Sequence, residues 1–191
     1  MSSQPKTFLS PEEYLELERK AERKSEYYQG EMFAMAGASR WHGVIVFNVA
    51  GELSRQLKGR PCEAYMSDMR VKVSPTGLYT YPDVVVVCGE PKFDDTRADT
   101  LVNPTLIIEV LSDSTRDYDL GRKFQHYQTL PSLQEYLTVE QDRMRVDHRV
   151  RLPENQWLLT EFSGPEQVLE LKSISCQLAL SEIYDKVEWP A

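Results

Sequence analysis

Apolar residues recur along this chain with the spacing of helices in some segments and of strands in others. Ser10 precedes Pro11 and lies three residues before Glu13, a pattern that predicts a capped helix start. A longer helix, capped by Ser39, is predicted over residues 40–58, with a core stripe of Val44, Ile45, Phe47, Leu53 and Leu57. A third helix is predicted over residues 116–130, after the possible caps Ser112, Asp113, Ser114 and Thr115 and before Pro131.

Shorter apolar runs bounded by turn residues predict strands. The hairpin 25–35 turns at Gln29–Gly30, and the run Val84–Val87 is apolar on both faces, as in the middle of a covered sheet. Further strands are expected at 62–66, 69–73, 105–111, 135–139 and 168–171, with a loop at 89–103, a hairpin over 143–159 and a closing helix at 180–187. The order of elements predicts one α+β domain over residues 1–191, with a mixed β-sheet flanked by helices.

Composition narrows the classes of protein to consider. The chain has 191 residues, of which 41% are hydrophobic and 27% charged, as in an ordinary globular protein. It has neither an apolar run long enough for a membrane helix nor a secretory signal at its start, so we expect a cytoplasmic protein without a membrane partner. Three widely spaced cysteines, Cys62, Cys88 and Cys176, predict reduced thiols rather than a disulfide or a zinc site. The net charge of -8 argues against a uniformly basic surface but leaves room for a local basic groove.

Two predicted central strands carry carboxylates. Asp83 begins one strand, and Glu109 lies near the end of the next. If these strands pair antiparallel, the two carboxylates become neighbours and, with the backbone carbonyl of Val110, suit Mg²⁺ or Mn²⁺ better than zinc. The structural alternatives are an exposed turn carboxylate for Asp83, which follows Pro82, and neutralisation of Glu109 by a buried arginine.

A lysine follows in the next helix. Lys123 has Tyr127 four residues later on the same face and Asp119 four residues earlier. A surface ion pair with Asp119 explains the lysine equally well, and Asp117 and Asp119 suit a helix start. Only beside Asp83 and Glu109 does Lys123 acquire a chemical role.

Together these motifs resemble the PD-(D/E)XK nuclease superfamily and, within it, the Uma family of restriction endonucleases. The similarity rests on Pro82-Asp83, on Glu109-Val110-Leu111 and on Lys123, and it extends from the first helix to Ile183-Tyr184. It implies a restriction-endonuclease-like core that hydrolyses phosphodiester bonds of DNA with Mg²⁺ or Mn²⁺. Asp83 and Glu109 would hold the metal, and Lys123 would orient the attacking water or stabilise the developing charge. The superfamily lysine expected two residues after the glutamate is Leu111 here, so Lys123 has to supply that charge.

The remaining candidates each have a structural alternative. Glu26 completes the metal site by similarity, or is a carboxylate at a hairpin edge. Tyr127 is a hydroxyl partner of the site or a packing residue. His42 could contact a phosphate or have a structural role, and Asp68 could be a supporting acid of the site or a turn former. Arg116 and Arg122 could contact the nucleic-acid backbone or balance the charge of nearby aspartates.

The sequence therefore predicts a metal-dependent endodeoxyribonuclease, a hydrolase that acts as a homodimer so that two sites address two strands. The alternative is a catalytically inactive member of the same fold that regulates by binding nucleic acid or a protein partner. Fold similarity alone does not decide between them.

Overall fold

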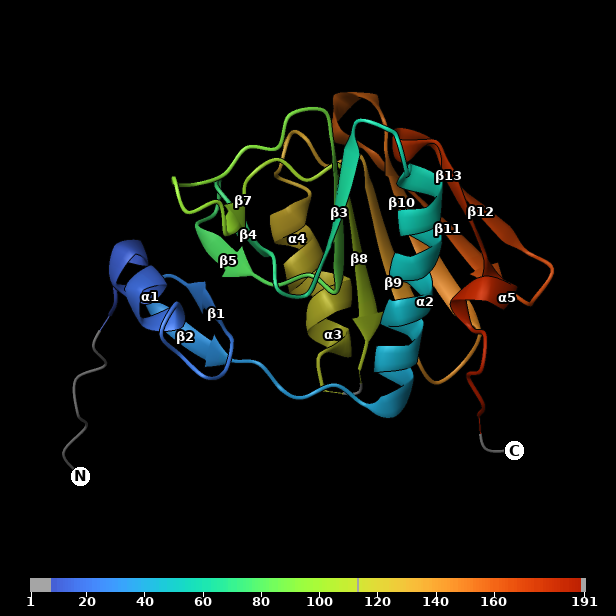
Figure 1. The fold of residues 1–191 in the computed structure, drawn as a ribbon, viewed down its shortest axis with the longest axis horizontal. Coiled ribbons are helices and arrows are strands. Elements are labelled where there is room, and N and C mark those ends of the chain that lie inside the picture. Colours follow the sequence, from blue (N-terminus) through green and yellow to red (C-terminus); the bar gives the residue numbers. More distant parts are fainter. Residues whose placement is uncertain (1–7, 113, 190–191) are drawn as a thin grey trace.

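A six-stranded mixed sheet forms the centre of the protein, in a computed structural model that describes residues 8–112 and 114–189 (Figure 1). Its strand order is β11-β10-β9-β8-β6-β3, with β8 and β9 parallel and the other neighbours antiparallel. The strands are β3 (Cys62–Met66), β6 (Val84–Cys88), β8 (Leu106–Leu111), β9 (Glu135–Glu140), β10 (Arg145–Arg151) and β11 (Trp157–Ser163). The predicted α+β fold with a mixed sheet is confirmed. The predicted cap Asp113 lies outside the described residues.

Successive side chains of the central strands point to opposite faces, so each face has its own apolar core. On one face α2 (Arg40–Leu57) packs Ile45 and Leu53 against the cluster that contains Val84 and Val86. On the other face Val85 and Val87 join a cluster contributed by the second sheet and by the helix that follows β8. The run Val84–Val87 is buried throughout, as its two-sided apolar pattern predicts.

The predicted stripe of α2 is wrong at two positions. Phe47 is 72% exposed and Val44 is only half-buried, whereas Val46 and Val49 are buried in the core. The spacing of apolar residues along this helix is compatible with burial of either of two adjacent faces, and the position of the sheet relative to the helix decides which face is buried.

A second sheet of five strands, in the order β2-β1-β5-β4-β7, lies beside the first (Figure 1). Its strands are β1 (Ser25–Tyr28), β2 (Glu31–Ala34), β4 (Arg70–Val73), β5 (Leu78–Thr80) and β7 (Thr100–Leu101). The predicted hairpin turn is present, with positive φ at Gln29 and Gly30. β7 lies in the segment expected to be a loop. α1 (Pro11–Glu18) has the predicted capping box at Ser10.

The C-terminal part of the chain closes the core on the α2 side. It contains β12 (Val168–Leu171), the 3₁₀ turn Lys172–Ile174, β13 (Cys176–Ala179) and α5 (Leu180–Ile183). α5 is shorter than the helix predicted there. A further 3₁₀ turn, Pro153–Asn155, connects β10 to β11. None of the helices in the described part of the chain has the length and hydropathy of a membrane-spanning segment.

The prediction of three reduced cysteines is wrong for Cys62 and Cys88, which form a disulfide. The antiparallel register of β3 and β6 places these two residues directly opposite each other, with their Cα atoms 4.0 Å apart. Cys176 is free and buried, as expected. Sequence separation alone could not reveal this pairing, because it depends on which strands become neighbours.

Candidate active site

Two carboxylates meet where β6 and β8 pair. Val84 lies opposite Ile108, so the next pair in the antiparallel register brings Asp83 beside Glu109. The backbone N–H of Asp83 lies 3.4 Å from Glu109 Oε2, and the N–H of Val110 donates to Asp83 Oδ2 at 2.8 Å. The antiparallel register that the sequence suggested is therefore present.

The helix after β8 is interrupted by a π-helical segment. It comprises α3 (Arg116–Tyr118), the π-helix Asp119–Lys123 and α4 (Phe124–Tyr127), rather than one regular helix over 116–130. Asp119 and Lys123 lie four residues apart at the two ends of this segment, a spacing that places side chains on one face of a helix. Both residues are buried.

Lys123 points at the carboxylates. Its Nζ lies 3.0 Å from Glu109 Oε1, 3.3 Å from Asp119 Oδ1 and 3.3 Å from Glu26 Oε1. The pair with Asp119 exists but belongs to a buried cluster, so the lysine is not part of a surface ion pair. Glu26 reaches this cluster from β1 and accepts a hydrogen bond from Thr80 on β5.

Two further side chains hold the carboxylates in place. The Tyr127 hydroxyl donates to Glu109 Oε1 at 2.9 Å from one side of the sheet. On the other side, His42 lies in the first turn of α2, and its Nε2 is 3.1 Å from Asp83 Oδ2. In Figure 1 the helix α3–α4 and the helix α2 stand on opposite sides of β8, which explains how they reach the same pair of acids.

Burial dominates the electrostatics of the cluster. It raises the pKa of Glu109 to about 8, against the lowering effect of Lys123, and it also raises the pKa of Asp119. Burial by itself would lower the pKa of Lys123, but the charges of Glu109, Glu26 and Asp119 hold that pKa well above its usual value. For His42 the hydrogen bond and charge of Asp83 outweigh burial and raise the pKa.

The donor set fits a hard divalent cation. The carboxylates of Glu26, Asp83, Glu109 and Asp119 outnumber the single amine of Lys123. Burial raises the pKa of Glu109, and the neighbouring carboxylates Asp119 and Asp83 raise it further. Within residues 8–112 and 114–189, no group of three or more His, Cys, Asp or Glu side chains is arranged so that it could hold a metal ion. Mg²⁺ commonly binds through one or two carboxylates plus waters and substrate phosphate, which matches the pair Asp83 and Glu109.

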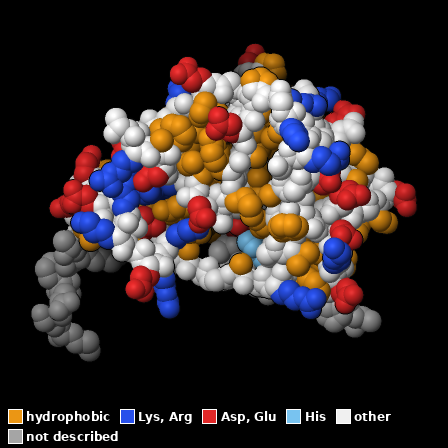
Figure 2. Space-filling model, viewed as in Figure 1, with side chains coloured by type: hydrophobic (Ala, Val, Ile, Leu, Met, Phe, Trp, Pro, Cys, Tyr) orange, Lys and Arg blue, Asp and Glu red, His pale blue; other side chains and the backbone are white. Residues whose placement is uncertain are grey.

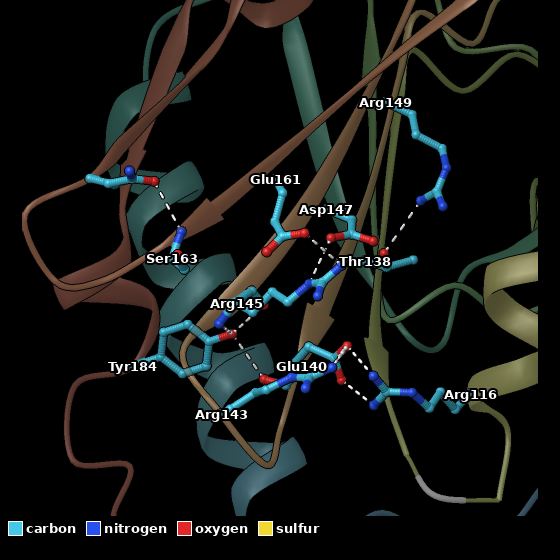
Figure 3. A network of polar contacts seen from close by, with 11 residues as sticks. Arg116, Thr138, Glu140, Arg143, Arg145, Asp147, Arg149, Glu161, Ser163 and Tyr184 are labelled. Atoms are coloured by element: carbon cyan, nitrogen blue, oxygen red, sulfur yellow. Dashed lines mark hydrogen bonds and ion pairs between the residues drawn. The ribbon is translucent and has the colours of Figure 1, made fainter.

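Three predicted residues lie apart from this cluster. The Asp68 side chain is 93% exposed and pairs with Lys24 in a turn. Arg116 directs its guanidinium at both oxygens of Glu140, at the end of β9 (Figure 3). Arg122 is exposed on the helix that carries Lys123.

Three residues in the cluster were not assigned to the site from the sequence. The sequence predicts Asp119 as a helix-start carboxylate, although its spacing from Lys123 is a usable signal. Thr80 hydrogen-bonds Glu26, and the hydroxyl of Tyr118, whose pKa is raised mainly by burial, also bonds to Glu26. Neither residue has a sequence signal, since the first contact depends on the pairing of β1 with β5 and the second on the packing of α3 against β1.

The antiparallel strands of a mixed sheet thus bring together two carboxylates, and the following helix adds a buried lysine. A crystal structure described as a putative nuclease belonging to DUF820, from Anabaena variabilis, superposes with a TM-score of 0.74. The alignment covers 94% of this chain and 99% of the other, at 18% identity, and so supports the fold.

Sequence comparison identifies the family. The model of the Uma2 family, described as "Putative restriction endonuclease", matches residues 11–181, and the chain belongs to this family. Two uncharacterized proteins of Synechocystis are similar to it. One, sll1609, is 43% identical over 85% of this chain and 92% of its own length. The other, slr1290, is 38% identical over 95% of this chain and 94% of its own length.

Proposed function

We propose that this protein is a Mg²⁺-dependent endonuclease that hydrolyses phosphodiester bonds of DNA, with Mn²⁺ as a substitute ion. The observation that carries the proposal is the placement of Lys123 Nζ 3.0 Å from Glu109, beside Asp83. Asp83, Glu109 and the carbonyl of Val110 would hold the ion. When bound, Mg²⁺ polarises a phosphate and lowers the pKa of a coordinated water.

The residues of the chain would divide the remaining work. Lys123 stabilises negative charge that develops on the phosphate, a role open to a protonated amine whose pKa is raised well above its usual value. His42 and Tyr127 position Asp83 and Glu109 through one contact each. Glu26 positions Lys123 and is available as a further acid near the metal.

DNA is proposed as the substrate because the family and fold are those of nucleases, and because a phosphodiester matches a site with both a metal and a lysine. Exposed Arg122 is available to the phosphate backbone, whereas Arg116 would first have to release Glu140. We further propose a homodimer and a cytoplasmic location.

Metal binding can be tested without any turnover. Calorimetric titration with Mg²⁺ and with Mn²⁺ should show binding to the wild type and to Asp117→Asn, an exposed acid near the site. Binding should be weakened or lost in Asp83→Asn and in Glu109→Gln, because each removes one of the two carboxylates. Equal binding by all four proteins would disprove this metal site.

Catalysis needs a separate assay. Supercoiled plasmid incubated with Mn²⁺ or Mg²⁺ should be cut by the wild type and by Lys172→Met, which removes an exposed lysine. Lys123→Met should lose at least about a hundredfold in rate if the amine stabilises transition-state charge. Metal binding without cleavage by the wild type would favour the inactive, regulatory alternative. Unchanged cleavage by Lys123→Met would remove the lysine from the mechanism.

A further inference from the structure

The strand β3 ends the six-stranded sheet and leaves one side of its backbone open. The β3–β6 register pairs Ala64 with Val86, and the carbonyl of Val86 accepts from Thr105 on the β8 side. Backbone groups of successive residues in a strand point to opposite sides. Cys62, Ala64 and Met66 therefore direct their backbone groups away from the sheet.

This outer edge has few partners of its own. Among the described residues, no hydrogen bond reaches the backbone N–H or C=O of Ala64 from the open side, and the carbonyl of Met66 accepts only from the turn residue Met69. The disulfide between Cys62 and Cys88 joins the strand covalently to β6. The edge is therefore rigid and able to pair, and a strand in this state readily accepts another chain.

We propose that a second copy of this chain pairs with β3 in antiparallel register, with Ala64 opposite the same residue of its partner. The proposal names the surface for the homodimer proposed above and does not depend on the chemistry of the site. Pairing about Ala64 joins the two sheets into one of twelve strands. An interface of this kind is isologous, since the same surface is used by both copies.

The side chains of β3 suit this register. Glu63 of one copy lies opposite Tyr65 of the other, so a carboxylate faces a phenol rather than another carboxylate. Within one chain the Tyr65 hydroxyl already donates to Glu63, which shows that the two groups can reach each other on this face. Like charges are therefore not opposed directly across the interface.

Apolar surface flanks the edge on the side of α2. Met66 is 45% exposed, and Phe47 on α2 is 72% exposed. Figure 2 shows hydrophobic side chains gathered over this part of the molecule, where α2 and β3 face the viewer. Antiparallel pairing sets the partner's Met66 opposite Cys62, beside a groove of about 470 Å³ between α2 and β3. Leu57, Cys62 and the chain's own Met66 line this groove together with the polar Ser54 and Lys58. The exposed methionine of each copy thus lies next to apolar side chains of the other.

The opposite edge of the sheet is less suited to self-pairing. β11 carries Glu161 near its middle, in an ion pair with Arg145, and the N–H of Ser163 near its end is bonded to Gln167. β11 also carries an exposed apolar side chain, Leu159, which is comparable to Met66 on β3. A substitution of Leu159 therefore serves as the control for substitutions on β3.

Pairing through β3 has a consequence for the two sites. In each copy Asp83 lies three residues along β6 from Val86, and the two copies run in opposite directions, so the two Asp83 residues are displaced toward opposite ends of the joined sheet. The two β6 strands are three strand spacings apart, because both β3 strands lie between them. With a rise of ~3.4 Å per residue and a spacing of ~4.8 Å per strand, the two Asp83 residues lie roughly 25 Å apart. They face opposite ends of the joined sheet, so each site would act by itself and cleavage of a duplex would begin with single nicks.

The test compares oligomeric states by analytical ultracentrifugation over a range of concentrations. The wild type should be a dimer. Ala64→Pro should be a monomer, because proline removes an N–H that points outward and obstructs edge pairing. Met66→Glu should weaken the dimer at least about tenfold, and Leu159→Glu on β11 should leave it unchanged. Thermal unfolding checks that each variant is folded. If Ala64→Pro does not fold, the dimer affinity of Met66→Glu provides the test of the interface.

Two results would overturn the proposal: a wild type that is monomeric at all concentrations, or a dimer that Leu159→Glu dissociates while Met66→Glu does not. Plasmid cleavage per site should be equal in the wild type and in a folded monomeric variant, since the sites act separately. A wild type that cleaves plasmid without forming a dimer would refute the interface and leave the proposed nuclease function standing. A wild type that forms the dimer without cleaving would refute the nuclease function and leave the interface standing.

Discussion

Replacing Glu109 by glutamine should change how the stability of the protein depends on pH. The pKa of this carboxyl rises from 4.5 to about 8 on folding, chiefly because burial disfavours its charged form. The folded state then keeps a proton that the unfolded state has released, so stability is greatest below about pH 4.5 and falls as pH rises through about 8. At 1.36 kcal/mol per pH unit, the loss reaches at most about 5 kcal/mol.

The free energy of unfolding should be measured by urea denaturation in chelator, from about pH 5 to about pH 8. Glu109→Gln has no proton to hold in this window, so its stability should fall less steeply than that of the wild type. His42 also has a raised pKa and contributes a decline of the same sign, but it is present in both proteins. Glu170→Gln, which changes an exposed carboxylate, should follow the wild type. Parallel profiles for the wild type and Glu109→Gln would refute the reasoning, since they would mean that Lys123 keeps Glu109 ionised throughout.

Repeating the measurement with saturating Mg²⁺ connects the titration to the proposed metal site. A cation favours the ionised form of Glu109, so added Mg²⁺ should stabilise the wild type more at about pH 8 than at about pH 5. Glu109→Gln should show little of this gain. A gain independent of pH would place the ion elsewhere.

Three other predictions concern stability. Ser10→Ala should cost about 1 kcal/mol in urea unfolding, because it removes the capping box of α1, whereas an unchanged midpoint would mean that α1 contributes little to folding. Glu135→Ala should cost about 3 kcal/mol or more, since Glu135 is the buried acceptor for His148, and a loss below about 1 kcal/mol would contradict this. Thiol titration of the denatured, unreduced protein should find one reactive group per chain, Cys176, and three would contradict the disulfide. Cys62→Ser should then lower stability by up to about 3 kcal/mol.

The sequence by itself determined the local elements and suggested, as a hypothesis, the pairing of the two key acids. The capping box at Ser10 and the turn at Gly30 each depend on interactions within a few residues, and the two-sided apolar run before Cys88 predicts a covered strand from its composition alone. The position of Asp83 at a strand start and of Glu109 near the next strand's end led to the observed register, because one antiparallel pairing was enough to join them.

Only the tertiary structure decided where several side chains point and which distant residues meet. Lys123 and Asp119 are buried because their face of the helix packs toward the strands that carry Glu26 and Glu109, and no pattern in the sequence predicts the π-helical segment between them. Phe47 faces outward because the sheet packs against the other side of α2, and Cys62 bonds to Cys88 because β3 and β6 become neighbours. Each of these outcomes depends on contacts between elements far apart in the chain, and hydrophobic spacing along one element cannot specify them.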